Sequence, residues 1–261
     1  MDRIRPATRA LFASGMTGLG LAGLWYGDFA VVLREIPTWV PARMAIVYAA
    51  AALMLVSGIG LLFERTAALG ARVLFFYLAL WVLLLDVPMV LMAPLVVNSW
   101  ATMAHIVVLL AGGWVLFAAV ASPPDGSTSN VATGKRGARI AQLLFGLALP
   151  PLGLAHFAYL SVTVSFVPAW LPYRTAWAYL TGTAQIAAGF AVLFSIVPRL
   201  AATLEAAMLT VFTILVWIPA IVARPSVERS WEGLTVSWAC SAAAWAVAAS
   251  ISRDDRLTKR A

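Results

Sequence analysis

Eight long runs of apolar residues dominate this sequence and limit what it can fold into. Each run is about 20 residues long, which is the length of helix that crosses the hydrocarbon core of a bilayer. The runs cover residues 10–29, 43–63, 70–92, 100–121, 139–160, 175–196, 199–222 and 232–251. Charged residues make up only 11% of the chain, too few to cover a water-soluble domain. The sequence therefore predicts an all-α integral membrane protein with eight transmembrane helices, whose surface contacts the lipid bilayer.

The positions of lysine and arginine predict the orientation of these helices, because positive residues are enriched in cytoplasmic loops. With a cytoplasmic N-terminus, thirteen of the 18 Lys and Arg residues fall in cytoplasmic segments and five in outer ones. We therefore expect a multi-pass protein of the inner (plasma) membrane with both termini and the polar segment near Gly126 in the cytoplasm. The net charge of +7 comes from residues that flank the apolar runs, so nucleic-acid binding is not expected.

Several kinds of chemistry are not favoured by the residues present. Cys240 is the single cysteine, which excludes an internal disulfide and a CxxC redox pair. The sequence holds two histidines and no cysteine beside them, so neither a metal nor another cofactor is expected. Gly18-Leu-Gly20-Leu-Ala-Gly23 spells GxGxxG inside an apolar run, which predicts close helix packing rather than nucleotide binding. No nucleophile–base arrangement is visible, so the sequence does not favour an enzyme.

The two halves of the chain align without gaps at an offset of 131 residues. The segment from Pro37 to Arg43 (PTWVPAR) falls on the segment from Pro168 to Arg174 (PAWLPYR). Tryptophans and prolines matched in register do not follow from a shared apolar composition, so they predict a tandem duplication. Four helices per copy give both copies the same orientation, and we expect two four-helix bundles side by side, related by rotation about the membrane normal. The predicted parts are a first repeat (residues 1–121), a polar cytoplasmic linker (122–138) and a second repeat with a basic tail (139–261).

Short motifs in the second half match those of a known family. They are His156-Phe157, Val167-Pro168-Ala-Trp170-Leu-Pro172, Trp177-Ala-Tyr179-Leu-Thr-Gly182, Gln185, Gly189, Arg199-Leu-Ala-Ala202 and Pro219. In these residues the second half resembles the DoxX-type membrane family, which includes MauE-like proteins. The first half resembles it as a diverged copy, with Trp25-Tyr26 in place of the His-Phe pair and Met54 in place of Gln185. The resemblance implies a four-helix membrane unit, sometimes an accessory to oxidoreductases or quinone-linked enzymes, with no defined reaction.

Asp86 and His105 form a candidate polar pair inside the membrane. Counting ~1.5 Å per residue places them about 21 Å and 20 Å above the inner interface, on neighbouring helices. In the second repeat both are replaced together, by Trp217 and Val236. Joint loss is expected of two residues that hydrogen-bond to each other, because either alone would be left without a partner in lipid. The pair either joins two helices or handles a proton or ligand.

A second group of candidates would bind a ligand near the outer face. Pro150 and Pro151 predict a kink that opens an outward-facing polar cavity near His156, Gln185 and Arg174. Alternatively, His156 is an interfacial residue and Gln185 bonds a backbone carbonyl. The first repeat has Trp25 at the His156 position, so its equivalent space should be filled.

Charged residues near the helix ends complete the set of candidates. The outer-loop arginines, Arg43 and Arg174, either cap the loop at the interface or receive an anionic group. Glu205 is expected near the inner interface, close to Arg199.

These observations leave three functions open. The leading one is a non-enzymatic membrane subunit with an outward-facing polar cavity that binds a small or amphipathic molecule or supports a partner oxidoreductase. The second is a proton-coupled transporter of small molecules. The third is an enzyme acting on a membrane-dissolved substrate such as a quinone.

Overall fold

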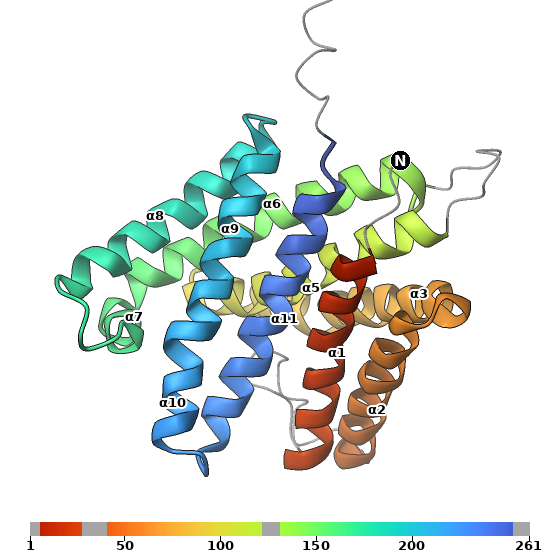
Figure 1. Ribbon diagram of the computed structural model, residues 1–261, viewed down its shortest axis with the longest axis horizontal. Helices are drawn as coiled ribbons and strands as arrows, with labels where there is room; N and C mark the ends of the chain where they lie inside the picture. The colour runs from red at the N-terminus through yellow and green to blue at the C-terminus, as the bar shows by residue number, and fades with distance from the viewer. Residues whose placement is uncertain (1–5, 28–40, 122–130, 253–261) are drawn as a thin grey trace, which may run out of the picture.

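A computed structural model describes residues 6–27, 41–121 and 131–252 of the chain. These residues are almost entirely helical and contain no strand within the ranges given (Figure 1). The first half forms α1 (Pro6–Tyr26), α2 (Arg43–Leu62), α3 (Glu64–Trp81), η1 (Val82–Asp86), α4 (Val87–Met92) and α5 (Val97–Val120). The second half forms α6 (Gly134–Ala158), α7 (Leu160–Phe166), α8 (Arg174–Leu193), α9 (Pro198–Phe212), η2 (Thr213–Trp217), α10 (Ile218–Ala223) and α11 (Glu228–Ser250).

Seven helices of the described residues are long and apolar enough to cross a membrane, which indicates a multi-pass membrane protein. Two of them are compound, since α3, η1 and α4 run on continuously, as do α9, η2 and α10. The predicted span at residues 10–29 corresponds to α1, which is long enough but is not among the seven. Its glycines, Ser14 and Thr17 lower the mean hydropathy of this helix, and residues 28–29 lie outside the described ranges.

The compound helices each contain one π-helical turn just before a proline. The Val87 N–H bonds to the Val82 carbonyl, and the Ile218 N–H bonds to the Thr213 carbonyl. Pro88 follows the first turn and Pro219 the second. A proline cannot donate to the helix ladder and its ring crowds the preceding turn, so a widened turn relieves the clash without ending the helix.

The two halves show the same local structure at the 131-residue offset. The bounds of α2 and α8 differ by this number, as do those of η1 and η2 and those of α4 and α10. Ala42 and Tyr173, which precede α2 and α8, both have a φ of 54°. The Trp100 indole donates to the Pro94 carbonyl at 2.8 Å, and Trp231 repeats this bond to Pro225 at 2.8 Å.

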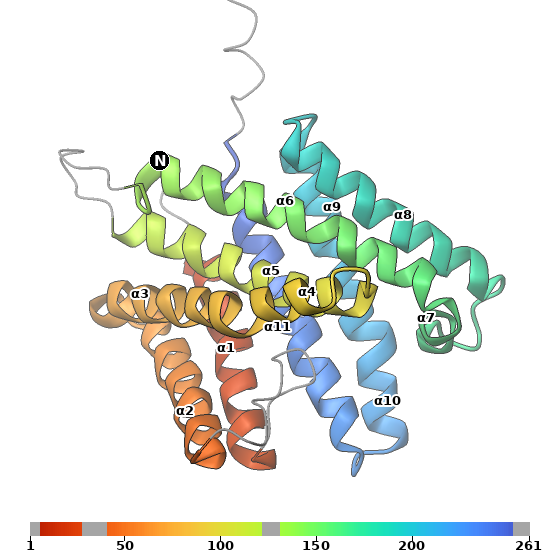
Figure 2. The same ribbon diagram turned by 180° about the vertical axis from the view of Figure 1, so that it is seen from behind.

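The helices pack as a closed ring that follows the chain order, and the ring crosses between the halves. The first helix of each half lies on the fourth helix of the other, α1 on α11 and α6 on α5, while α5 and α11 also touch (Figures 1 and 2). Within a half, the first and fourth helices touch only marginally. Two separate four-helix bundles were expected, and this expectation was wrong.

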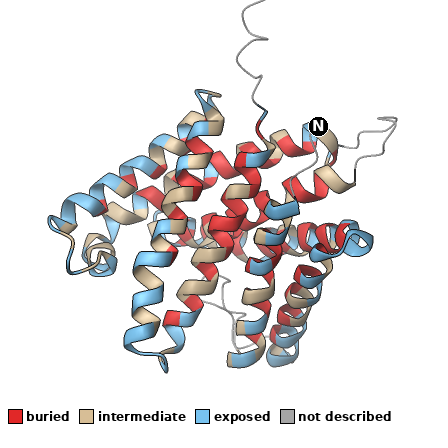
Figure 3. Ribbon diagram, viewed as in Figure 1, coloured by how far each residue is buried: buried red, intermediate tan, exposed pale blue. Residues whose placement is uncertain are grey.

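Small residues explain why the ring closes between the halves. A Cβ at Gly15 of α1 would lie 2.8 Å from the Ala239 Cα of α11. A Cβ at Gly112 of α5 would lie 2.6 Å from the Ala243 Cβ of α11. Such close backbone approach is how helices associate where lipid supplies no hydrophobic drive. Burial is highest around α5 and α11, and large apolar side chains such as Leu200, Leu204 and Val222 are exposed on the outside, as expected against lipid (Figure 3).

Candidate functional site

Asp86, His105 and His156 are the polar side chains at and beside the α5–α6 interface. Asp86 is fully buried at the last position of η1, and His105 and His156 lie on α5 and α6. Each imidazole Nδ1–H donates to the carbonyl four residues earlier, at 2.8 Å to Ala101 and 2.9 Å to Leu152. Each neutral ring therefore keeps Nε2 as an acceptor.

The two histidines, one from each half, lie on adjoining helices, His105 on α5 and His156 on α6. The sequence analysis assigned them to separate sites, because it expected α5 and α6 to belong to different bundles. The contact of His105 with Asp86 stays a prediction, since the hydrogen bond described for the His105 ring goes to its own helix.

Gln185 and Glu205 form a buried pair between α8 and α9. Each side chain is 2% exposed, and the Gln185 Nε2 donates to the Glu205 Oε1 at 3.1 Å. Glu205 was expected at the interface near Arg199, but it lies seven residues into α9, about 10 Å from its start, and faces α8. The sequence analysis missed Glu205 as a partner of Gln185. The sequence did contain a signal for this pair, since the first half replaces both residues together.

The residues at the equivalent positions of the first half are Met54 and Leu74. Both are fully buried. This is the same joint replacement that singled out Asp86 and His105, so each half has two polar residues that the other half replaces together.

Arg174 is not part of a site with Gln185. Its Nε donates to the Val167 carbonyl at 2.9 Å and its Nη2 to the Val164 carbonyl at 2.6 Å, which caps the end of α7. Eleven residues separate Arg174 from Gln185 on α8, or about 16 Å along the helix axis. These contacts favour the capping interpretation of the outer-loop arginines. Arg43 holds the equivalent first position of α2.

The two prolines of α6 were expected to open a cavity, but Pro150 packs against α8. The helix continues through Pro150 and Pro151 and is interrupted only at Tyr159. A Cβ at Gly189 of α8 would lie 2.7 Å from the Pro150 Cδ, so the ring fills the space that this glycine leaves. The expected filling of the first half by Trp25 is also wrong, because that side chain is 80% exposed.

His156 lies against α8 and α9 one helical turn from Gln185. A Cβ at Gly182 would lie 2.8 Å from the His156 Cβ, and the Phe212 ring centroid is 6.4 Å from that of His156. Gly182 precedes Gln185 by three residues and so lies on the same face of α8. His156 and Gln185 therefore lie on facing sides of α6 and α8, about one helical turn apart, whereas Arg174 is bonded to the end of α7.

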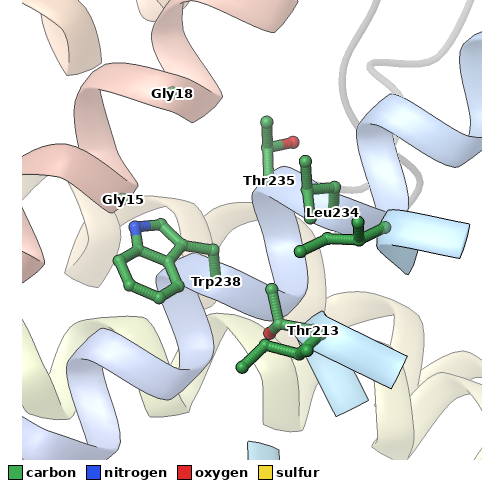
Figure 4. A pocket seen from close by; sticks show the side chains of 8 residues that line it. Gly15, Gly18, Thr213, Leu234, Thr235 and Trp238 are labelled. Carbon is green, nitrogen blue, oxygen red and sulfur yellow. The ribbon is translucent and has the colours of Figure 1, made fainter. Parts of the chain in front are cut away.

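In the described part of the chain, a cavity lies away from these residues, at the place where α1 and the η2–α10 segment flank α11. It has a volume of about 280 Å³ and takes its lining from both halves. Figure 4 shows the Trp238 indole beside Gly15. The lining residues are Gly15, Gly18, Thr213, Ile214, Ile218, Leu234, Thr235 and Trp238. Gly18 leaves room because it has no side chain, whereas the equivalent position of the second half holds the fully buried Leu149.

Polar atoms around this cavity form their hydrogen bonds within the protein. The Thr213 hydroxyl bonds to the Leu209 carbonyl and the Ser237 hydroxyl, both at 2.9 Å. The Thr235 hydroxyl donates to the Glu232 carbonyl at 3.0 Å, and the Trp238 indole donates to Ser14 at 2.9 Å. The cavity therefore presents apolar surface to an occupant.

The comparisons with known proteins give no activity. A family model described as a domain of unknown function (DUF8561) matches residues 145–249, which include His156, Gln185 and Glu205. No curated protein and no solved structure matches the chain. Across the described ranges, no group of three or more His, Cys, Asp or Glu residues is arranged to hold a metal ion.

Proposed function

We propose that this chain is a non-catalytic membrane subunit that takes the apolar part of a small amphipathic molecule from the bilayer into the cavity beside α11. The cavity carries the proposal, because Gly18 leaves space beside α11, with its nearest neighbour 3.7 Å from where a Cβ would lie, although the contact of Gly15 with Ala239 one turn away is close. Since the surrounding hydroxyls and the indole are already bonded, an occupant gains contact area but no polar partner there.

The size of the cavity indicates how much of the occupant it holds. A volume of about 280 Å³ is at or below the ~300–1,000 Å³ of sites that enclose a whole drug-sized ligand. One ring or one segment of a hydrocarbon tail fits this space, while the polar end of the molecule lies outside. A partner oxidoreductase that uses a membrane-dissolved molecule would benefit from such a subunit.

The architecture proposed with this function is eight transmembrane helices in two tandem four-helix repeats of the DoxX type, with both termini cytoplasmic in an inner membrane. The matched bounds of α2 and α8 and of η1 and η2 support the repeat. The matched indole bonds of Trp100 and Trp231 support it independently.

Proton-coupled transport is a second candidate, and the buried ionisable residues favour it. Asp86 and Glu205 are almost completely buried in segments long enough to span the membrane. Ionisable residues at such positions are often parts of proton or ion pathways. Flux of a substrate into proteoliposomes that follows an imposed pH gradient would favour this function over a binding subunit.

Filling the cavity tests the proposed binding. The full chain, reconstituted in bilayers with a diazirine-bearing phospholipid, should be photolabelled on the segment from Leu234 to Trp238. Gly18→Leu should abolish this label, because it places the residue of the second half in the cavity. Gly60→Leu is the matched control, since both glycines lie in helices with space for a Cβ, whose nearest neighbours are 3.7 Å and 3.8 Å away. Full labelling of Gly18→Leu would overturn the proposal.

A further inference from the structure

The Gln185–Glu205 pair has two acceptor atoms that its single hydrogen bond does not satisfy. Within the described part of the chain, Glu205 Oε2 and Gln185 Oε1 are buried and have no hydrogen-bond partner. An ionised carboxylate and an amide oxygen can only accept, so they cannot satisfy each other. One proton on Glu205 Oε2 would supply the missing donor.

The surroundings do not provide a cation for an ionised Glu205. The ionisable residues on α9 and on the elements packed against it are Arg174, Tyr179, Arg199, Glu228, Arg229, Glu232 and Cys240. His156 of α6 also lies against α8 and α9, one helical turn from Gln185, and its Nδ1–H bonds to the Leu152 carbonyl. Among the described hydrogen bonds of Glu205, the partner is Gln185. Arg199 lies six residues away at the inner end of α9, about 9 Å along the axis, and Arg174 is bonded to α7. Burying a carboxylate without a cation is unfavourable, because the charge loses its hydration, and protonation avoids this loss.

We propose that Gln185 and Glu205 form a proton-binding site inside the helix ring. The proton sits on Glu205 Oε2 and is donated to Gln185 Oε1, while Gln185 Nε2 donates to Glu205 Oε1. The two side chains then form a reciprocal acid–amide pair in which every polar atom is bonded. The proton comes from water and returns to water as Glu205 ionises, so no other bond changes. A metal ion fits poorly, because hard cations such as Ca²⁺ take six to eight oxygen ligands and the pair offers three.

The first half shows that the fold does not need this pair. Met54 and Leu74 occupy the equivalent positions between α2 and α3, and both are fully buried. An apolar pair thus joins the second and third helices of a half without any polar contact. The polar pair of the second half therefore supplies something other than packing, and a proton is the ligand that its chemistry accepts.

Infrared spectroscopy of the full chain in lipid bilayers tests the site. A protonated carboxyl gives a C=O stretching band that disappears on ionisation and shifts in D₂O. Wild-type protein should show this band at neutral pH, and Glu205→Gln should lose it. Asp86→Asn is the matched control, since it removes the other buried carboxyl and should keep the Glu205 band.

Two further measurements separate the proposal from its alternatives. Gln185→Met should keep the band but shift its frequency, because the acid loses its reciprocal partner. Addition of NaCl or CaCl₂ at constant pH should leave the band unchanged. A Glu205→Gln spectrum identical to wild type would overturn the proposal, as would loss of the band on adding either salt. The double variant Gln185→Met/Glu205→Leu reproduces the residues of the first half and serves as a folded reference without the band.

Discussion

A double-mutant cycle on Gln185 and Glu205 tests whether the pair is coupled as the structure indicates. Gln185→Met removes the described hydrogen-bond partner of Glu205, and Glu205→Leu leaves the Gln185 amide without an acceptor in an almost fully buried position. Leaving a buried polar group without a partner costs ~1–3 kcal/mol, so we expect each single variant to lose ~1–2 kcal/mol of unfolding free energy. The double variant should lie within ~0.5 kcal/mol of wild type, because Met54 and Leu74 fill the equivalent space.

The coupling free energy expected from this cycle is about 3 kcal/mol, the sum of the two single losses less the small loss of the double variant. Interhelical hydrogen bonds in membranes average ~0.6 kcal/mol and reach ~1.7 kcal/mol, so the expected value lies above this range. The larger value follows from the burial of both partners and from the carboxyl group, which costs more to strand than an amide. Reversible unfolding in mixed micelles, monitored by the loss of helical circular dichroism, measures the unfolding free energy of the wild type, the two single variants and the double variant. Two neutral single variants, or a double variant equal to the sum of the singles, would refute the reasoning.

The remaining predictions concern the other polar pair, the topology and the ring closure. His105→Ala alone should destabilise the fold more than the double change Asp86→Trp/His105→Val, because the single change removes the predicted partner of a buried carboxyl; equal unfolding free energies would contradict the pairing. Reporter fusions at Gly126 and at the C-terminus should both give cytoplasmic signals, and an outer signal at either would contradict the predicted topology. Gly15→Leu should lower the unfolding free energy by ~1–3 kcal/mol, since its Cβ would collide with Ala239; an unchanged thermal transition would contradict the close α1–α11 contact.

Helix positions followed from the sequence because they depend on local hydropathy. The predicted span at 43–63 corresponds to α2, and that at 232–251 differs from α11 by four residues at its start and one at its end. The interruption in the compound helices was not predicted, because a proline can kink, end or widen a helix. Which of these occurs at Pro88 depends on how the neighbouring helices hold the turn, and the residues around it do not reveal that.

The packing of the first and fourth helices could not be predicted from a repeated sequence. On the proposed duplication, α1 could contact the fourth helix of its own copy or that of the other, and similar residues would line both contacts. The choice depends on details such as the close fit of Gly15 with Ala239, which involves residues far apart in the chain. For the same reason the sequence did not indicate that His105 and His156 lie near each other.

The direction of side chains could not be predicted at the candidate site either. Counting residues along a helix gives depth, but it does not give the direction in which a side chain points. Glu205 was therefore assigned to the interface, although its side chain turns toward α8 and meets Gln185. Comparison of the two halves position by position would have identified the pair, because Met54 and Leu74 are its joint replacements.

The two junctions between the halves, α5–α6 and α1–α11, carry different kinds of residues. Helix α6 lies on α5 at one junction, and these helices carry His156 and His105. At the other junction α1 lies on α11, the equivalent positions hold Trp25 and Val236, and residues of both helices line the apolar cavity. Two copies that each kept all of these polar groups would carry the same chemistry at both junctions. On the proposed duplication, the first helix of each copy packs on the fourth helix of the other. Each copy can then lose a different subset of these polar groups. The ring then carries ionisable groups at one junction and an apolar cavity at the other, so the residues of each junction can change independently.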